Sequence, residues 1–185
     1  MTKWLSHRMV ERGIIKEEEQ ELYQFGICNG MILLLNVVTA LVIGLLTEQL
    51  AVVAVFTLSF MVLRSYTGGY HSDSRIFCYL GSNLVLLVPV YTQAVFYKTS
   101  LAWLLAVLLV SAGIIFLLSP MHSKNRKLDK EEQKHFGRKA RLIAALELAV
   151  LGILWHAGQI PYAYAVYTGI CITALFMLVG KAQLW

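Results

Sequence analysis

Apolar runs separated by short polar segments are the main pattern along this chain. Six runs have the composition of helices that cross a membrane, at residues 27–46, 50–63, 77–97, 101–118, 142–155 and 162–180. A helix needs about 20 predominantly apolar residues to cross the hydrocarbon core of a bilayer. We therefore predict an all-α, polytopic membrane protein with six transmembrane helices, in which residues 1–185 form a single integral-membrane domain.

The second run is short for a full crossing, because only about fourteen residues precede Arg64. Two arrangements fit this length: the helix continues and the Arg64 side chain extends to the lipid headgroups, or the helix ends inside the membrane. The third run contains Pro89, which membrane helices tolerate with a kink. Pro120 ends the fourth run, and we expect residues 119–141 to form a basic, hydrophilic cytoplasmic loop.

The N-terminal residues 1–25 mix apolar and basic side chains. This pattern fits an amphipathic segment on the cytoplasmic leaflet, and it fits a solvated helix face equally well. Gly13 is expected to end this segment. The acidic residues at positions 17–21 suit the first turns of the next helix, because the helix macrodipole favours negative charge there.

Lysine and arginine are distributed very unevenly between the two predicted sides of the membrane. With the N-terminus in the cytoplasm, 15 of the 16 lie on the cytoplasmic side, and Lys98 is the exception. Cytoplasmic loops of membrane proteins carry such an excess, so we predict that both termini and residues 64–78 face the cytoplasm. The net charge of +5 lies in segments that flank apolar runs, which favours contact with lipid over contact with nucleic acid.

Three cysteines, an odd number without paired spacing, argue against a disulfide framework. Cys28 and Cys171 lie inside apolar runs, where cysteine usually behaves as a small hydrophobic residue. Cys78 instead follows a polar stretch that contains His71. A neighbouring histidine can accept the proton of a thiol and stabilise the resulting thiolate, so His71 and Cys78 are candidates for a base and a nucleophile.

This pair cannot work on a straight helix, since seven residues rise about 10.5 Å along the helix axis. The sequence offers a break, because Gly68 and Gly69 disfavour helix and residues 72–74 suit a turn or a helix N-cap. We therefore predict that the helix is interrupted between the second and third apolar runs, and that this interruption lets His71 and Cys78 meet.

Asp73 has two possible roles in this segment. As an N-cap, it or its neighbour would place Cys78 in the first turns of the next helix, where the macrodipole, Arg64 and Arg75 would stabilise a thiolate. Alternatively, Asp73 holds the His71 ring in one tautomer. Two readings without this chemistry stay open. Arg64 and Arg75 could serve only to set the orientation of the protein in the membrane. Alternatively, His71, Asp73 and Cys78 could bind a metal, although the sequence has no second His or Cys pair at the spacing of a zinc site.

The connection before the fifth run carries eight lysines and arginines. A cytoplasmic loop that obeys the positive-inside rule would have this composition. Clustered cations also attract anions, so the same loop would serve as an electrostatic dock for an acidic peptide or for anionic lipid. Both interpretations fit the sequence.

The arrangement of Arg64, Gly68, Gly69, His71 and Cys78 resembles the signature of the accessory gene regulator protein B (AgrB) family, membrane peptidases of peptide quorum sensing in Gram-positive bacteria. The entry to the first span, the start of the basic loop and the total length are similar to that family as well. The resemblance implies that His71 and Cys78 are the catalytic pair and that Arg64 is functionally important. A looser match to the family's lysine-rich loop involves Lys124, Arg126 and Lys127.

The resemblance also implies an activity. Members of that family cleave the C-terminal part from an AgrD-like propeptide, keep the peptide as a thioester on the enzyme cysteine and release a cyclic thiolactone or lactone. It implies no cofactor and no metal, a location in the cell membrane and a homodimer. Two rival functions remain: a non-enzymatic transporter or assembly factor with a structural polar loop, and a lipid-headgroup enzyme. The latter would need an acidic metal cluster, and Glu147 is the only acidic residue inside a predicted span.

Overall fold

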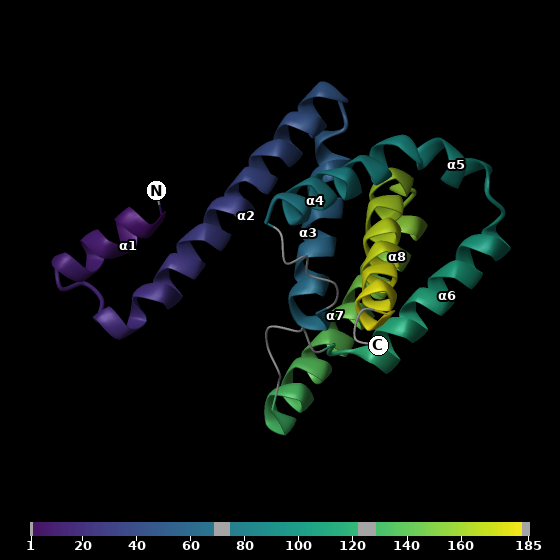
Figure 1. The fold of residues 1–185 in the computed structure, drawn as a ribbon. Helices are drawn as coiled ribbons and strands as arrows, with labels where there is room; N and C mark the ends of the chain where they lie inside the picture. Colours follow the sequence, from purple (N-terminus) through teal and green to yellow (C-terminus); the bar gives the residue numbers. More distant parts are fainter. Residues whose placement is uncertain (1, 69–74, 122–128, 183–185) are drawn as a thin grey trace. The chain divides into compact units, whose positions relative to one another are not determined.

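The computed structural model describes residues 2–68, 75–121 and 129–182 (Figure 1). Every element within these ranges is helical, which confirms the all-α prediction. In chain order they are α1 (Thr2–Glu11), the 3-10 helix η1 (Glu17–Glu19), α2 (Gln20–Leu46), α3 (Leu50–Thr67), α4 (Arg75–Tyr91), α5 (Gln93–Lys98), α6 (Leu101–Leu118), α7 (Lys130–His156) and α8 (Ile160–Ala182). They form two compact units, residues 1–39 and 40–185, which are described separately.

Four segments of the described chain are long and apolar enough to cross a membrane: Glu17–Leu46, Leu50–Thr67, Leu101–Leu118 and Ile160–Ala182. These confirm a polytopic membrane protein. The predicted third span is divided between α4 and α5, and α4 has 17 residues, fewer than the about 20 that a full crossing needs. The predicted fifth span is the second half of α7. The count of six spans and their orientation therefore stay predictions.

The second apolar run forms a longer helix than its composition indicates. Helix α3 continues through Arg64 to Thr67 and has 18 residues. The helix continues past Arg64, as the first of the two arrangements requires, but the Arg64 guanidinium lies over the ring of Phe176 in α8, and where the helix ends relative to the lipid headgroups stays a prediction. A single cation does not end a helix, since arginine has a good helix propensity and Arg64 lies in the last turn, where the macrodipole favours positive charge.

The boundary between α4 and α5 is held by the last helix. Pro89 lacks the N–H group that an α-helix uses, and two residues after it the helix ends. The Thr92 hydroxyl donates to the Val88 carbonyl at 2.7 Å and is also hydrogen-bonded to the Tyr164 hydroxyl of α8. The ring of Phe96 in α5 packs on Tyr164, with 4.8 Å between ring centroids. Contacts with α8 therefore fix the direction in which the chain leaves α4.

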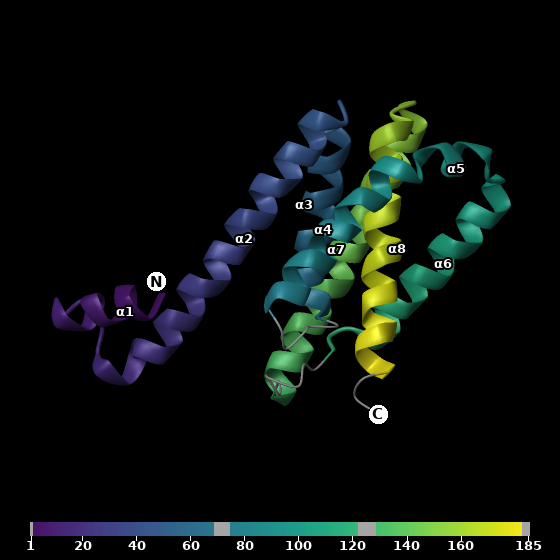
Figure 2. The ribbon, with the colours of Figure 1, turned by 45° about the horizontal axis from the view of Figure 1, so that its top comes forward.

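Helix α8 forms the centre of residues 40–185 and lies between α3 and α6 (Figure 2). In the most apolar 18-residue window of α8, 67% of the residues are buried, whereas the corresponding fraction is 33% in α3 and 11% in α6. Two apolar clusters surround it, one containing Phe56 of α3 and the other containing Leu63 of α3 and Met177 of α8. Helix α6 exposes large apolar side chains such as Trp103 and Leu117, which fits a helix that faces lipid.

A tight turn joins α2 to α3. Glu48 has a positive φ of 57°, and the amide of Gln49 donates to the carbonyl of Gly44 at 2.9 Å. Gly44 lies so close to the start of α3 that an added Cβ would be 2.8 Å from the Cα of Leu50. The hairpin therefore requires a residue without a side chain at position 44.

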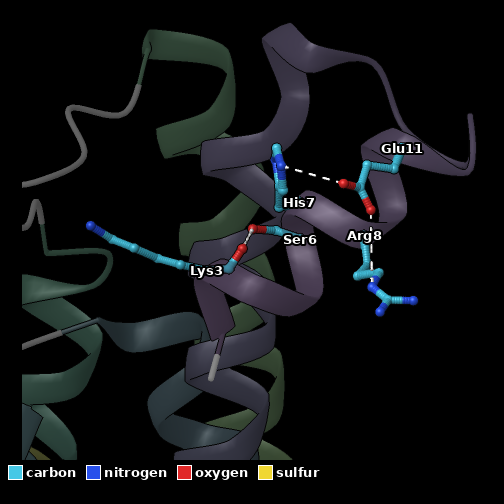
Figure 3. Close-up of polar contacts among 5 residues, drawn as sticks. All are labelled: Lys3, Ser6, His7, Arg8 and Glu11. Carbon is cyan, nitrogen blue, oxygen red and sulfur yellow. Dashed lines mark hydrogen bonds and ion pairs between the residues drawn. The ribbon is translucent and has the colours of Figure 1, made fainter.

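Helix α1 belongs to the first unit, and its polar contacts are the hydrogen bond from the buried Ser6 hydroxyl to the Lys3 carbonyl and two exposed ion pairs of Glu11 (Figure 3). Glu11 lies 3.6 Å from the Nε2 atom of His7 and 3.9 Å from the Nε atom of Arg8, and the Arg8 guanidinium lies 5.0 Å from the Trp4 ring centroid. Such exposed pairs contribute about 0–1 kcal/mol each. The helix ends before Gly13, as predicted, whereas its place on a leaflet stays a prediction.

The predicted loop at residues 119–141 is shorter than expected, because α7 begins at Lys130. Asp129 occupies the N-cap, and its amide donates to the Glu132 carboxylate at 3.3 Å, one half of a capping box. The residues that follow are mostly good helix formers, so the basic character of this stretch does not prevent a helix.

Candidate functional site

The break predicted in the polar stretch is present at Gly68. Helix α3 ends at Thr67, and the amide of Gly68 donates to the Arg64 carbonyl at 3.2 Å. Gly68 has φ 72° and ψ −154°, a region of backbone conformation that is essentially restricted to glycine. The next helix, α4, begins at Arg75. Arg64 and Cys78, two of the predicted site residues, therefore lie on different helices.

Cys78 is the fourth residue of α4, whose first residue is Arg75. The prediction that Cys78 lies in the first turns of the following helix is confirmed. The other predicted site residues of this stretch, Gly69, His71 and Asp73, lie outside the described residues. The contact between His71 and Cys78, and the role of Asp73, therefore stay predictions.

The guanidinium of Arg64 is directed toward α8. Its Cζ atom lies 4.7 Å from the ring centroid of Phe176 and 5.8 Å from that of Phe60. A guanidinium over an aromatic face is attracted by the ring quadrupole. Arg64 thus combines a position one turn before Gly68 with a side chain that aromatic residues hold in place.

The first half of α7 packs against the end of α3. The rings of Tyr66 and Phe136 are 6.4 Å apart, and the Nζ atom of Lys139 lies 5.8 Å from the Tyr66 ring centroid. One cation of the predicted basic stretch therefore lies beside the end of α3. The three basic residues that the resemblance selected, Lys124, Arg126 and Lys127, lie outside the described residues.

A third element meets the end of α3, the segment Ser119–Met121. The amide of Met121 donates to the Thr67 carbonyl at 2.9 Å. This bond satisfies one of the carbonyls that the end of a helix leaves without an intrahelical partner. On its other side the segment contacts Gly137 of α7, where an added Cβ would lie 3.0 Å from the Cδ atom of Pro120. Gly137 was not among the predicted site residues, and its signal in the sequence is a glycine within a run of helix formers.

The other candidates for metal or thiol chemistry are the acidic, histidine and cysteine side chains elsewhere in the described chain. No group of three His, Cys, Asp or Glu side chains within the described residues could hold a metal ion. The hypothesis that the polar stretch binds a metal involves His71 and Asp73, which lie outside the described residues, so the structure does not test it. Cys28 and Cys171 are free cysteines, partly buried within α2 and α8.

These observations define a polytopic helical membrane protein whose candidate site lies where α3 ends and α4 begins. A comparison with family models identifies the family: residues 1–178 match accessory gene regulator B, and the chain belongs to that family. This membership supports a role in the processing of quorum-sensing peptides in the accessory gene regulator system.

Individual relatives are distant. The chain is 23% identical over 148 residues to a putative AgrB-like protein of Clostridium perfringens strain SM101, covering 77% of this chain and 69% of the relative. It is 26% identical over 121 residues to accessory gene regulator protein B of Staphylococcus intermedius, covering 65% of this chain and 62% of that protein. The chain therefore spans about two thirds of the curated relatives it matches. No solved structure matches it.

Proposed function

We propose that this chain is a membrane cysteine endopeptidase that cleaves the C-terminal part from an AgrD-like propeptide and forms a cyclic thiolactone or lactone. The observation that carries the proposal is the break between α3 and α4, with Cys78 in the first turn of α4. A helix N-terminus favours an anion through its macrodipole and its free N–H groups, and a thiolate is the reactive form of cysteine. The break also gives His71 a route to the thiol that a straight helix would deny.

The reaction proceeds in two acyl transfers. His71 accepts the proton of the Cys78 thiol, and the sulfur attacks the carbonyl carbon of the scissile peptide bond. The protonated His71 then donates to the leaving amine, so the C–N bond breaks and the peptide stays on Cys78 as a thioester. A Cys or Ser side chain of the bound peptide attacks this thioester, its proton passes to His71, and Cys78 leaves as the thiolate. Ring closure onto a Cys exchanges one thioester for another, so it is nearly isoenergetic.

The residues around the pair have supporting roles in this proposal. Arg64, with its guanidinium held over Phe176, would bind a substrate carboxylate or stabilise the oxyanion. Arg75 begins α4 and would add positive charge near the thiolate. Asp73 would orient His71 or cap α4. The basic residues Lys124, Arg126 and Lys127 would raise the local concentration of an acidic substrate segment.

The proposal also specifies where the enzyme works and with which partners. The distribution of lysine and arginine places the site on the cytoplasmic side of the cell membrane, where thiols are kept reduced. Apolar helices on both sides of the site would help to keep water from the thioester. The enzyme would work as a homodimer in contact with membrane lipids and without a cofactor.

The test is co-expression with a candidate propeptide. Cys78→Ala and His71→Ala are each expected to abolish cleavage while the protein still inserts in the membrane, and Cys28→Ala, as a matched control, should cleave normally. Mass spectrometry of the wild-type protein should detect the peptide attached to Cys78. Full cleavage by Cys78→Ala would refute the proposal and favour a non-enzymatic role.

A further inference from the structure

Two glycines enclose the segment Ser119–Met121, which we call the bridge. At Gly68 an added Cβ would lie 2.7 Å from the Met121 carbonyl oxygen, a backbone atom that cannot rotate away. At Gly137 an added Cβ would lie 3.0 Å from the Pro120 Cδ atom and 3.4 Å from the Ser119 carbonyl oxygen. The bridge therefore fits between the exit of α3 and the side of α7 only because neither position carries a side chain.

The bridge is also fixed along its own length. Ser119 and Pro120 are buried, and the amide of Ser119 donates to the Ile115 carbonyl at 3.1 Å. At the other end Met121 donates its amide to Thr67 and packs its side chain against the apolar cluster that contains Leu63. A segment whose two N–H groups are hydrogen-bonded, whose first two residues are buried and which has contacts on both sides acts as a rigid spacer, because packed interiors transmit displacements.

We infer that the bridge positions the exit of α3, and that Gly137 is a positioning residue for the proposed reaction. Gly68 is the first residue after α3 and lies three residues before His71. A methyl group at position 137 would push Pro120 by a few tenths of an ångström, and the contact between Met121 and Gly68 would pass that movement to the start of the segment that carries His71. This inference rests on the proposed function, because it requires His71 to act on Cys78.

The experiment compares Gly137→Ala with Gly152→Ala. Both glycines lie within α7, and a Cβ at position 152 would meet nothing within 4 Å. Two quantities are measured on the full-length protein in detergent: the rate of precursor cleavage, and the pH profile of iodoacetamide alkylation at Cys78, read by peptide mass spectrometry. A thiol that ionises alone reacts mainly near and above its pKa of about 8.5, whereas an imidazole partner extends its reaction to lower pH.

We expect Gly137→Ala to slow cleavage roughly tenfold or more, because small misplacements of catalytic groups have large effects on rate. Its alkylation profile should shift toward that of an ordinary thiol, a change that mere loss of stability would not produce in the folded fraction. Gly152→Ala should keep the wild-type rate and profile. Met121→Ala removes the side chain that packs this end of the bridge against the Leu63 cluster and adds no atom, so it should loosen the bridge and shift the profile in the same direction even if Gly137→Ala fails to fold.

The outcomes separate the two proposals. If wild-type Cys78 already reacts like an ordinary thiol and Cys78→Ala still cleaves, the proposed function fails and the inference fails with it. If the wild-type profile extends to low pH while folded Gly137→Ala and Met121→Ala keep both profile and rate, only the inference about the bridge is overturned. A shifted profile in either folded variant, with Gly152→Ala unchanged, supports it.

Discussion

Helices α3, α7 and α8 of the second unit meet around Ser59, and the contacts there allow a quantitative prediction. The Ser59 hydroxyl of α3 donates to the Glu147 carboxylate of α7 at 3.0 Å. Gly169 of α8 packs against Ser59, and an added Cβ there would lie 2.7 Å from the Ser59 hydroxyl oxygen and 3.4 Å from the Ser59 Cβ. The hydroxyl therefore occupies space that a side chain at position 169 would need.

Three variants test this arrangement. Ser59→Ala removes the hydrogen bond to Glu147 and should lower the free energy of unfolding by about 1–2 kcal/mol. Gly169→Ala should lower it by about 1–3 kcal/mol, because the hydroxyl can move aside only by giving up that bond. With Ser59→Ala already present, the nearest atom to the new methyl is the residue-59 Cβ at 3.4 Å, so Gly169→Ala should then cost little.

The assay is unfolding of the purified protein by increasing SDS in mixed micelles. The double variant should be about as stable as Ser59→Ala alone, which corresponds to a coupling free energy of at least about 1 kcal/mol. Gly113→Ala in α6, where a Cβ would meet nothing within 4 Å, is the control and should change little. Strictly additive effects of Ser59→Ala and Gly169→Ala would refute the packing argument, since two independent sites do not compensate one another.

Two further stability predictions use the same assay. Gly44→Ala should lower the free energy of unfolding by about 1–3 kcal/mol, because its Cβ would lie 2.8 Å from the Leu50 Cα, a backbone atom; stability equal to that of Gly113→Ala would contradict this. Arg141→Ala should cost about 0.5–1.5 kcal/mol, because the Nε atom of Arg141 donates to the Phe116 carbonyl at 3.1 Å near the end of α6. Arg141→Lys should recover part of that loss by keeping a cation at the helix C-terminus, and no recovery would show that charge is unimportant there.

Hydropathy predicted the helices well where local composition alone determines them. The runs at 101–118 and 162–180 correspond closely to α6 and α8. The break at Gly68 was also predictable, since adjacent glycines and a polar turn precede Cys78. The start of α7 at Lys130 was missed because a charged stretch was interpreted as a loop, although Asp129 and Glu132 form a recognisable helix start.

Other features depend on residues far apart in the sequence. The end of α4 near Thr92 is held by Tyr164, which lies 72 positions later. The importance of Gly137 arises from its contact with Pro120 and not from its place in α7. The side chain of Arg64 points to Phe176, and no local pattern relates these two positions. Local signals therefore predict most of the apolar helices and the break at Gly68, whereas the end of α4 and the surroundings of the candidate site follow from tertiary packing.

The last turn of α3 shows why this packing matters for the proposed chemistry. Successive helix residues are rotated by about 100°, so the side chains of Arg64 and Tyr66 project in different directions, while Thr67 makes its contact through its backbone carbonyl. Each meets a different partner: α8 through Phe176, α7 through Phe136, and the bridge through Met121. The chain therefore leaves α3 from a turn that is held on three sides, and the left-handed conformation of Gly68 sets its initial direction. In the proposed reaction, His71 lies between α3 and α4 in the sequence and Cys78 lies on α4, so a fixed exit from α3 would help to place the base against the nucleophile.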